Sequence, residues 1–198
     1  MIVQVPTGLS VARQTWGQQR NDIDFRSPFG AQALEVASPL WVSSITAGLK
    51  RPGLWHALIL QLRGKSNQLA LWDMGRPLPR GTMRGAMTVA AAAAGATSLT
   101  ITAAGEAGKS LEAGDRLGVG AGLTQQVVMV LADAVANGSG VIVVATEPPL
   151  RNAFGAGSPI TWNRPCALFR RQDSRSQWDN EPGVVKGMML DLIEDWRP

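Results

Sequence analysis

The distribution of tryptophan is the feature that most constrains the fold of this chain. Seven tryptophans occur in 198 residues, and none lies between Trp72 and Trp162. That stretch is instead rich in Ala, Gly, Val and Thr, and the alanine run 90–94 lies near its start. Such a change in composition indicates a separate folding unit. We therefore expect a discontinuous first domain, residues 1–83 plus 165–198, with a second domain, residues 84–164, inserted into it.

Within the inserted segment, short strand-like runs recur roughly every 10 to 15 residues. Turn residues separate them, including Gly120-Ala121-Gly122 and Asn137-Gly138-Ser139-Gly140. Evenly spaced short strands with such turns are typical of a small antiparallel β-barrel. The expected strands are residues 98–102, 115–119, 126–131 and 141–145.

The first domain is also predicted to be mainly β. Runs of β-branched and bulky apolar residues predict strands at 33–36, 40–47 and 54–62, and the last is apolar on both alternating faces, as a central core strand would be. Ser66 is expected to cap one short helix that runs through Trp72 and ends before Gly75 and Pro77. Residues 166–171 and 184–193 would add two strands and complete the sheet system.

Composition and charge exclude several function classes. The single Cys166 forms no intrachain disulfide, and with one histidine the chain has no zinc-ligand set of the usual kind. We find no signal peptide and no membrane span, so we expect synthesis in a reducing cytoplasm. Nine Lys and Arg against four Asp and Glu give residues 1–83 a net charge of +5, but these basic residues are scattered. We therefore do not predict nucleic-acid binding.

Candidate catalytic motifs favour structural roles. His56 lies within an apolar run, which indicates a packed histidine and not a catalytic base. Gly118-x-Gly120-x-Gly122 lacks the Lys-Ser/Thr of a phosphate loop and is predicted to be a hairpin turn. The carboxylates Asp22 with Asp24, and Asp191 with Glu194 and Asp195, match no metal-binding loop, so we expect them on the solvated surface. We predict no enzyme activity, no cofactor and no metal.

The tryptophans have two interpretations. Their flat rings could line a sugar-binding groove, which makes a carbohydrate-binding module the alternative function. In a chain without tyrosine, however, Trp and Met are expected to supply core bulk and interface anchors. Only 17% of the residues are charged, which leaves neutral surface for partners to cover.

A series of short motifs carries a resemblance to a known family. The first half has Arg13, Trp16, Gln19-Arg20, Arg26-Ser27-Pro28-Phe29-Gly30, the run from Trp55 to Leu62, Leu69-Ala70-Leu71-Trp72 and Gly114-Asp115. The second half has Pro148-Pro149-Leu150-Arg151, the run from Ala167 to Arg171 and a closing strand that runs to Trp196. In this order the chain resembles tail proteins of long-tailed bacteriophages, in particular the distal tail protein type.

The resemblance implies a structural virion protein. Its expected fold is a β-sandwich belt domain, and residues 84–164 would match an inserted barrel of the oligonucleotide/oligosaccharide-binding type. Its expected assembly is a homohexameric ring at the distal end of the tail tube, where it would join the tail tube protein to hub or tip proteins.

We predict which residues take part in assembly. The segment up to Gly30 has weak periodicity and several Gln and Arg, so we expect an arm or loop that orders against a neighbour. Interface contacts are expected from a set of aromatic and arginine side chains: Trp16, Arg20, Arg26, Phe29, Trp41 and Trp178.

Overall fold

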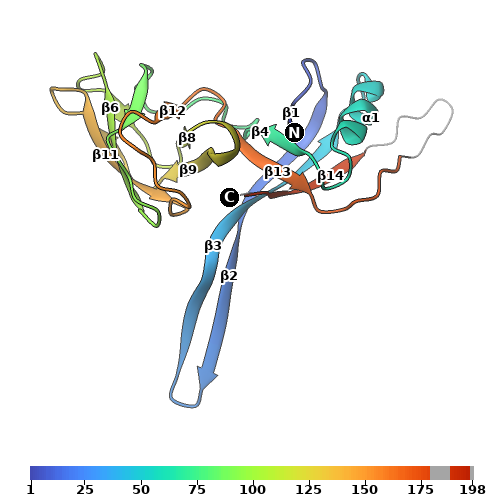
Figure 1. Cartoon of the computed structure of the whole chain (residues 1–198), viewed down its shortest axis with the longest axis horizontal. Helices are drawn as coiled ribbons and strands as arrows, with labels where there is room; N and C mark the ends of the chain where they lie inside the picture. Colours follow the sequence, from blue (N-terminus) through green and yellow to red (C-terminus); the bar gives the residue numbers. More distant parts are fainter. Residues whose placement is uncertain (179–187, 197–198) are drawn as a thin grey trace.

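The computed structural model describes residues 1–178 and 188–196 and is mainly β, as the sequence predicts. A six-stranded sheet lies beside a closed barrel, and a long hairpin projects from the sheet (Figure 1). The sheet and its helix comprise β1 (Ile2–Gln4), β2 (Val11–Ser27), β3 (Gly30–Ala47), α1 (Pro52–Gln61), β4 (Gln68–Leu71), β13 (Ala167–Arg171) and β14 (Met189–Glu194). The remaining elements are β5 (Met87–Val89), β6 (Ser98–Ala103), β7 (Ser110–Leu111), β8 (Arg116–Val119), the 3₁₀ turn η1 (Gly122–Thr124), β9 (Gln126–Val130), β10 (Ala134–Val135), β11 (Val141–Glu147) and β12 (Pro159–Thr161).

The six-stranded sheet joins the two ends of the chain. Its strand order is β1-β4-β13-β14-β3-β2, so β13 and β14 lie between strands from the first part of the chain. Helix α1 packs in one apolar cluster with these strands, because its Trp55 and Leu58 are buried against Ile45, Phe169 and Leu192. The predicted strand at 166–171 is confirmed. The predicted strand at 184–193 is confirmed from Met189, and residues 184–187 lie outside the described part of the chain.

The barrel consists entirely of strands between Met87 and Thr161. Its order is β11-β6-β5-β12-β8-β9, and it closes because β11 pairs antiparallel with both β6 and β9. All four strand-like runs identified in this segment form strands. Gly120 and Gly122 lie in the β8–β9 hairpin connection, as predicted, whereas Gly118 lies within β8 and pairs with Val127. Alternating residues fill the interior, among them Leu99, Ile101, Leu117, Val128 and Ile142.

The projecting hairpin is formed by the outer halves of β2 and β3. Pro28 and Phe29 make the turn, because Ser27 pairs with Gly30. We call residues 21–37 the arm; it extends away from the sheet, the barrel and α1 (Figure 1). The segment up to Gly30 was predicted to be an arm or a loop. The loop is wrong for Val11–Ser27, which is strand β2, whereas residues 21–30 do belong to an arm, and its ordering against a neighbour stays a prediction. The strands predicted separately at 33–36 and 40–47 are one continuous strand, β3. It continues through Ser38 and Pro39 because Pro39 lies at a register irregularity where the ladder needs no donor.

Two predicted elements have the opposite secondary structure. Residues 54–62 were expected to be a strand, but Pro52–Gln61 is helix α1, which starts with Pro as helices commonly do. The run is apolar on every side, so its pattern fits a buried strand and a buried helix equally well. The expected helix from Ser66 to Trp72 is wrong as well, because Gln68–Leu71 is the fully buried strand β4. Burial between β1 and β13 overrides its helix propensity.

Candidate functional site

One face of the arm is apolar and open to solvent. The register places Ile23 opposite Leu34 and Phe25 opposite Gln32, and Val36 follows Leu34 on the same face by strand alternation. Phe29 at the tip is 100% exposed. The large apolar side chains of the face are about half exposed: Ile23 48%, Phe25 55%, Leu34 52% and Val36 58%. A contiguous exposed patch of this kind marks an interaction site.

The opposite face of the arm is charged and mostly acidic. Asp22 pairs in register with Glu35, and Asp24 and Arg26 continue the same face along β2. Arg26 lies 3.7 Å from Asp24 in an exposed ion pair. Three carboxylates against one arginine give the arm a net charge of −2. The arm is therefore an amphipathic two-stranded ribbon.

The long edges of the arm lack strand partners among the described residues. Strand β2 is the terminal strand of the sheet, and β14 pairs with β3 only from Val42 to Thr46. The backbone groups along both edges of the arm are consequently available to another strand. Exposed edges are where a second chain adds to a sheet most readily.

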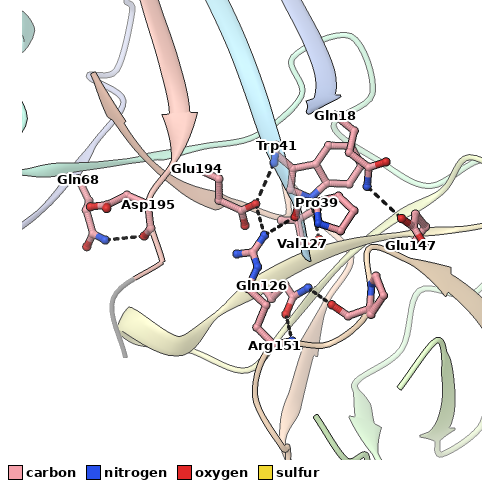
Figure 2. Close-up of polar contacts among 11 residues, drawn as sticks. Gln18, Pro39, Trp41, Gln68, Gln126, Val127, Glu147, Arg151, Glu194 and Asp195 are labelled. Carbon is pink, nitrogen blue, oxygen red and sulfur yellow. Dashed lines mark hydrogen bonds and ion pairs between the residues drawn. The ribbon is translucent and has the colours of Figure 1, made fainter. Parts of the chain in front are cut away.

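A buried ion pair anchors the base of the arm to the barrel. Arg151, in the loop after β11, contacts the carboxylate of Glu194 at 2.5 Å, and the two side chains are 6% and 3% exposed (Figure 2). Arg151 also donates to the carbonyl of Pro39 at 3.0 Å, and the backbone N–H of Trp41 donates to Glu194 at 2.9 Å. One guanidinium and one carboxylate thus join β3, β14 and a barrel loop.

Three further hydrogen bonds complete this junction. The indole Nε1 of Trp41 donates to the carbonyl of Val127 in β9 at 2.8 Å. On the neighbouring strand, Gln18 donates to Glu147 at 3.4 Å (Figure 2). Arg20 donates to the same carboxylate at 2.8 Å. The arm base is therefore fixed to the barrel from both β2 and β3.

The loop that carries Arg151 is itself held in place. Gln126 donates from Nε2 to the carbonyl of Pro149 at 2.9 Å, and its Oε1 accepts a hydrogen bond from the backbone N–H of Arg151 at 2.8 Å. Gln126 is buried, so these bonds satisfy an amide that would otherwise be costly to desolvate. They orient the loop so that Arg151 reaches Glu194.

The six predicted interface residues have different surroundings. Trp41 is buried, and Trp16 is half-buried beside it, with ring centroids 5.9 Å apart. Arg20 lies at the junction, whereas Arg26 and Phe29 are exposed on the arm. The ring of Trp178 stacks on His56 of α1 with a centroid distance of 4.4 Å. All three tryptophans therefore make contacts within the chain, and Arg26 and Phe29 face outward.

Sequence reasoning missed the apolar face of the arm and the buried ion pair. The alternation of Ile23 with Phe25, and of Leu34 with Val36, is a signal that could have revealed the face. Glu194 was expected on the solvated surface, and this is wrong because the side chain is buried against Arg151. Asp191 is exposed, as predicted.

Groups with catalytic potential do not gather in the described part of the chain. His56 is on α1, half-buried under Trp178, and not in a core strand. Burial raises the pKa of the Cys166 thiol to about 11, so the thiol stays protonated at neutral pH. Among residues 1–178 and 188–196, no three His, Cys, Asp or Glu side chains are arranged to hold a metal ion. Within the same residues, no helix has the length and hydrophobicity to cross a bilayer.

The chain was compared with models of protein families and with curated proteins. No model of a protein family matches the chain, and no curated protein matches it.

Proposed function

We propose that this chain is a structural subunit of a long-tailed bacteriophage tail. In this proposal it forms a hexameric ring at the distal end of the tail tube and connects the tube protein to hub or tip proteins. It works without catalysis or cofactor, and it resides in the virion after synthesis in the host cytoplasm. The motif order that resembles distal tail proteins supports the assignment.

The observation that carries the proposal is the arm. Its apolar face, and its two edges that have no strand partner in the described part of the chain, would be unfavourable on a protein that acts alone. A ring subunit needs a surface that a neighbour covers, and contacts between different surfaces of identical copies close into a ring when the rotation allows it. The arm supplies such a surface.

The junction supports the same role. A ring subunit can set the positions of the proteins on either side of it only if its arm and its barrel are held in a fixed orientation. The buried Arg151–Glu194 pair and the buried hydrogen bond of Trp41 join the arm base to the barrel, together with the exposed contact between Arg20 and Glu147. A displacement of the barrel would therefore also displace the arm.

The tryptophans give little support to the alternative function, carbohydrate binding. Trp41 and Trp55 are buried, and Arg164 and Arg84 lie over the rings of Trp72 and Trp162. Rings covered in this way do not offer flat faces to a sugar.

Electron microscopy tests the proposed function. Negative-stain images of the purified chain should contain closed rings, and an antibody against the chain should label the distal end of the tail on phage particles that encode it. Labelling of the capsid, or of no part of the particle, would exclude the proposed position.

A further inference from the structure

The outer edge of β2 in the arm is open to a second strand. Strand β2 is the terminal strand of the sheet, and no strand within residues 1–178 and 188–196 pairs with this edge. The stretch 22–27 contains no proline, lysine or bulge, the usual features that prevent pairing at an exposed edge. The arm also projects away from the sheet, the barrel and α1, so another chain can approach the edge (Figure 1).

The register of the hairpin fixes which backbone groups this edge presents. A two-residue turn makes Ser27 and Gly30 the hydrogen-bonded pair that closes the hairpin. Every second residue back along β2 bonds to β3 in the same way. The N–H and C=O groups of the residues between them, Asp22, Asp24 and Arg26, therefore point to the outer edge.

The charges along this edge have both signs. Asp22, Asp24 and Arg26 lie on one face of the arm, and the side chains of Asp24 and Arg26 are 62% and 82% exposed. An edge with charges of one sign would repel a copy of itself, whereas this edge can place an arginine opposite an aspartate. The edge can therefore pair with its own copy.

The outer edge of β3 is a less favourable partner for it. Residues 30–37 carry Glu35 as their only charge, so β2 of one copy and β3 of another form at most one attractive charge pair. When the outward positions of the two edges overlap fully, Asp22 faces Glu35. Carboxylates directly opposite each other are destabilising.

We propose that the β2 edges of two copies pair antiparallel across a two-fold axis at Phe25. In this register, Arg26 of each copy lies opposite Asp24 of the other, and the two Phe25 rings are neighbours on the apolar face. Moving the axis by one residue would place Asp24 opposite Asp24, or Arg26 opposite Arg26. The charges therefore select a single register.

This inference goes beyond the proposed ring and does not depend on it. A two-fold contact uses the same surface on both copies, so it joins two copies and cannot by itself close a ring. It occupies the edge of the arm and leaves the apolar face open to a ring neighbour. Rings and arm pairs can therefore be measured separately.

Disulfide trapping tests the register. At this edge the two Phe25 residues form a non-hydrogen-bonded pair with Cα atoms about 4.5 Å apart, which is within the range of a disulfide. We expect Phe25→Cys, in a Cys166→Ser background, to give a covalent dimer of twice 21.0 kDa under mild oxidation. The matched control is Gln32→Cys. Gln32 lies beside Phe25 on the same face, but the two β3 strands would be about 14 Å apart.

The outcomes separate the arm pair from the proposed function. A covalent dimer from Phe25→Cys and none from Gln32→Cys supports the pair. No dimer from Phe25→Cys, or equal yields from both variants, overturns it, and closed rings in negative-stain images would then leave the proposed function standing. Dimers without rings would have the reverse meaning. Far-UV circular dichroism on each variant establishes that it is folded.

A charge exchange within the Phe25→Cys chain provides a second test. Arg26→Asp places aspartates opposite aspartates, and Asp24→Arg places arginines opposite arginines. Each should lower the yield of covalent dimer at low salt by about tenfold or more. An equimolar mixture of the two variants should restore the yield, because an arginine then faces an aspartate at both positions. A mixture that stays as low as the separate variants would contradict the register.

Discussion

The barrel and the arm differ in where their apolar side chains go. The barrel buries Leu99, Ile101, Leu117 and Val128 within its own closed wall. No residue of the arm is buried, although Ile23, Phe25, Leu34 and Val36 are all large and apolar. The barrel thus buries its apolar side chains within one chain, whereas the arm leaves its own exposed, as expected if another copy covers them in the proposed ring. The predictions below test this contrast, from the largest expected effect to the smallest.

The junction between the two regions should be the most sensitive site. Replacing Arg151 with Ala leaves Glu194 buried without its partner, and we expect a loss of about 3–5 kcal/mol in the free energy of unfolding. Urea denaturation followed by tryptophan fluorescence measures it. The matched control is Arg26→Ala, which removes an exposed ion pair and should cost less than about 0.5 kcal/mol. Equal effects of the two substitutions would mean that the junction is not a buried anchor.

Shortening a side chain inside the barrel should cost nearly as much. Leu117 is fully buried, so Leu117→Ala is expected to destabilise the chain by about 2–5 kcal/mol through lost contacts and a cavity. Chemical denaturation measures the change. Assembly of the folded fraction should remain, because the barrel core faces no partner. A change below about 1 kcal/mol would show that the barrel interior is less tightly packed than described.

A substitution on the arm should weaken assembly and leave the stability of the monomer nearly unchanged. Phe25→Ser removes an exposed ring, so the free energy of unfolding of the monomer should change by less than about 0.5 kcal/mol. Assembly should weaken, because the phenyl ring of Phe25 belongs to the apolar face that a neighbouring copy covers in the proposed assembly. Sedimentation velocity measures assembly, and a thermal melt measures stability. A variant that assembles normally would remove Phe25 from the contact.

The smallest expected effect is a change in the alkylation rate of Cys166, which lies beside the junction. Its raised pKa of about 11 means that little thiolate exists at pH 7, so alkylation should be slow and should accelerate as the pH rises toward that value. Its backbone carbonyl accepts a hydrogen bond from Gln125 of the barrel at 2.6 Å. If Arg151→Ala loosens the barrel from the sheet, iodoacetamide labelling at pH 7 should become faster. An unchanged rate would argue that the barrel stays docked.

Sequence reasoning succeeded where a pattern has only one structural solution. Evenly spaced strand-like runs and the turn residues between them identified the barrel strands, because short strands joined by tight turns are what a small antiparallel barrel requires. It failed for α1 and β4, since both are short, mostly apolar runs without a decisive periodicity, and tertiary burial decides between helix and strand. Glu194 pairs with Arg151, 43 positions away, and nothing in the local sequence indicates that contact. The apolar face of the arm was visible only as a short alternation among polar residues.

The oligomeric mass of the chain with and without its arm tests the central claim most directly. Replacing residues 21–37 with an Asn-Gly turn keeps the base of the β2–β3 hairpin and removes the exposed face. Multi-angle light scattering should give a multiple of 21.0 kDa for the unaltered chain and a folded monomer for the shortened one. The same number of copies per particle for the two chains would contradict the claim that another copy covers the arm.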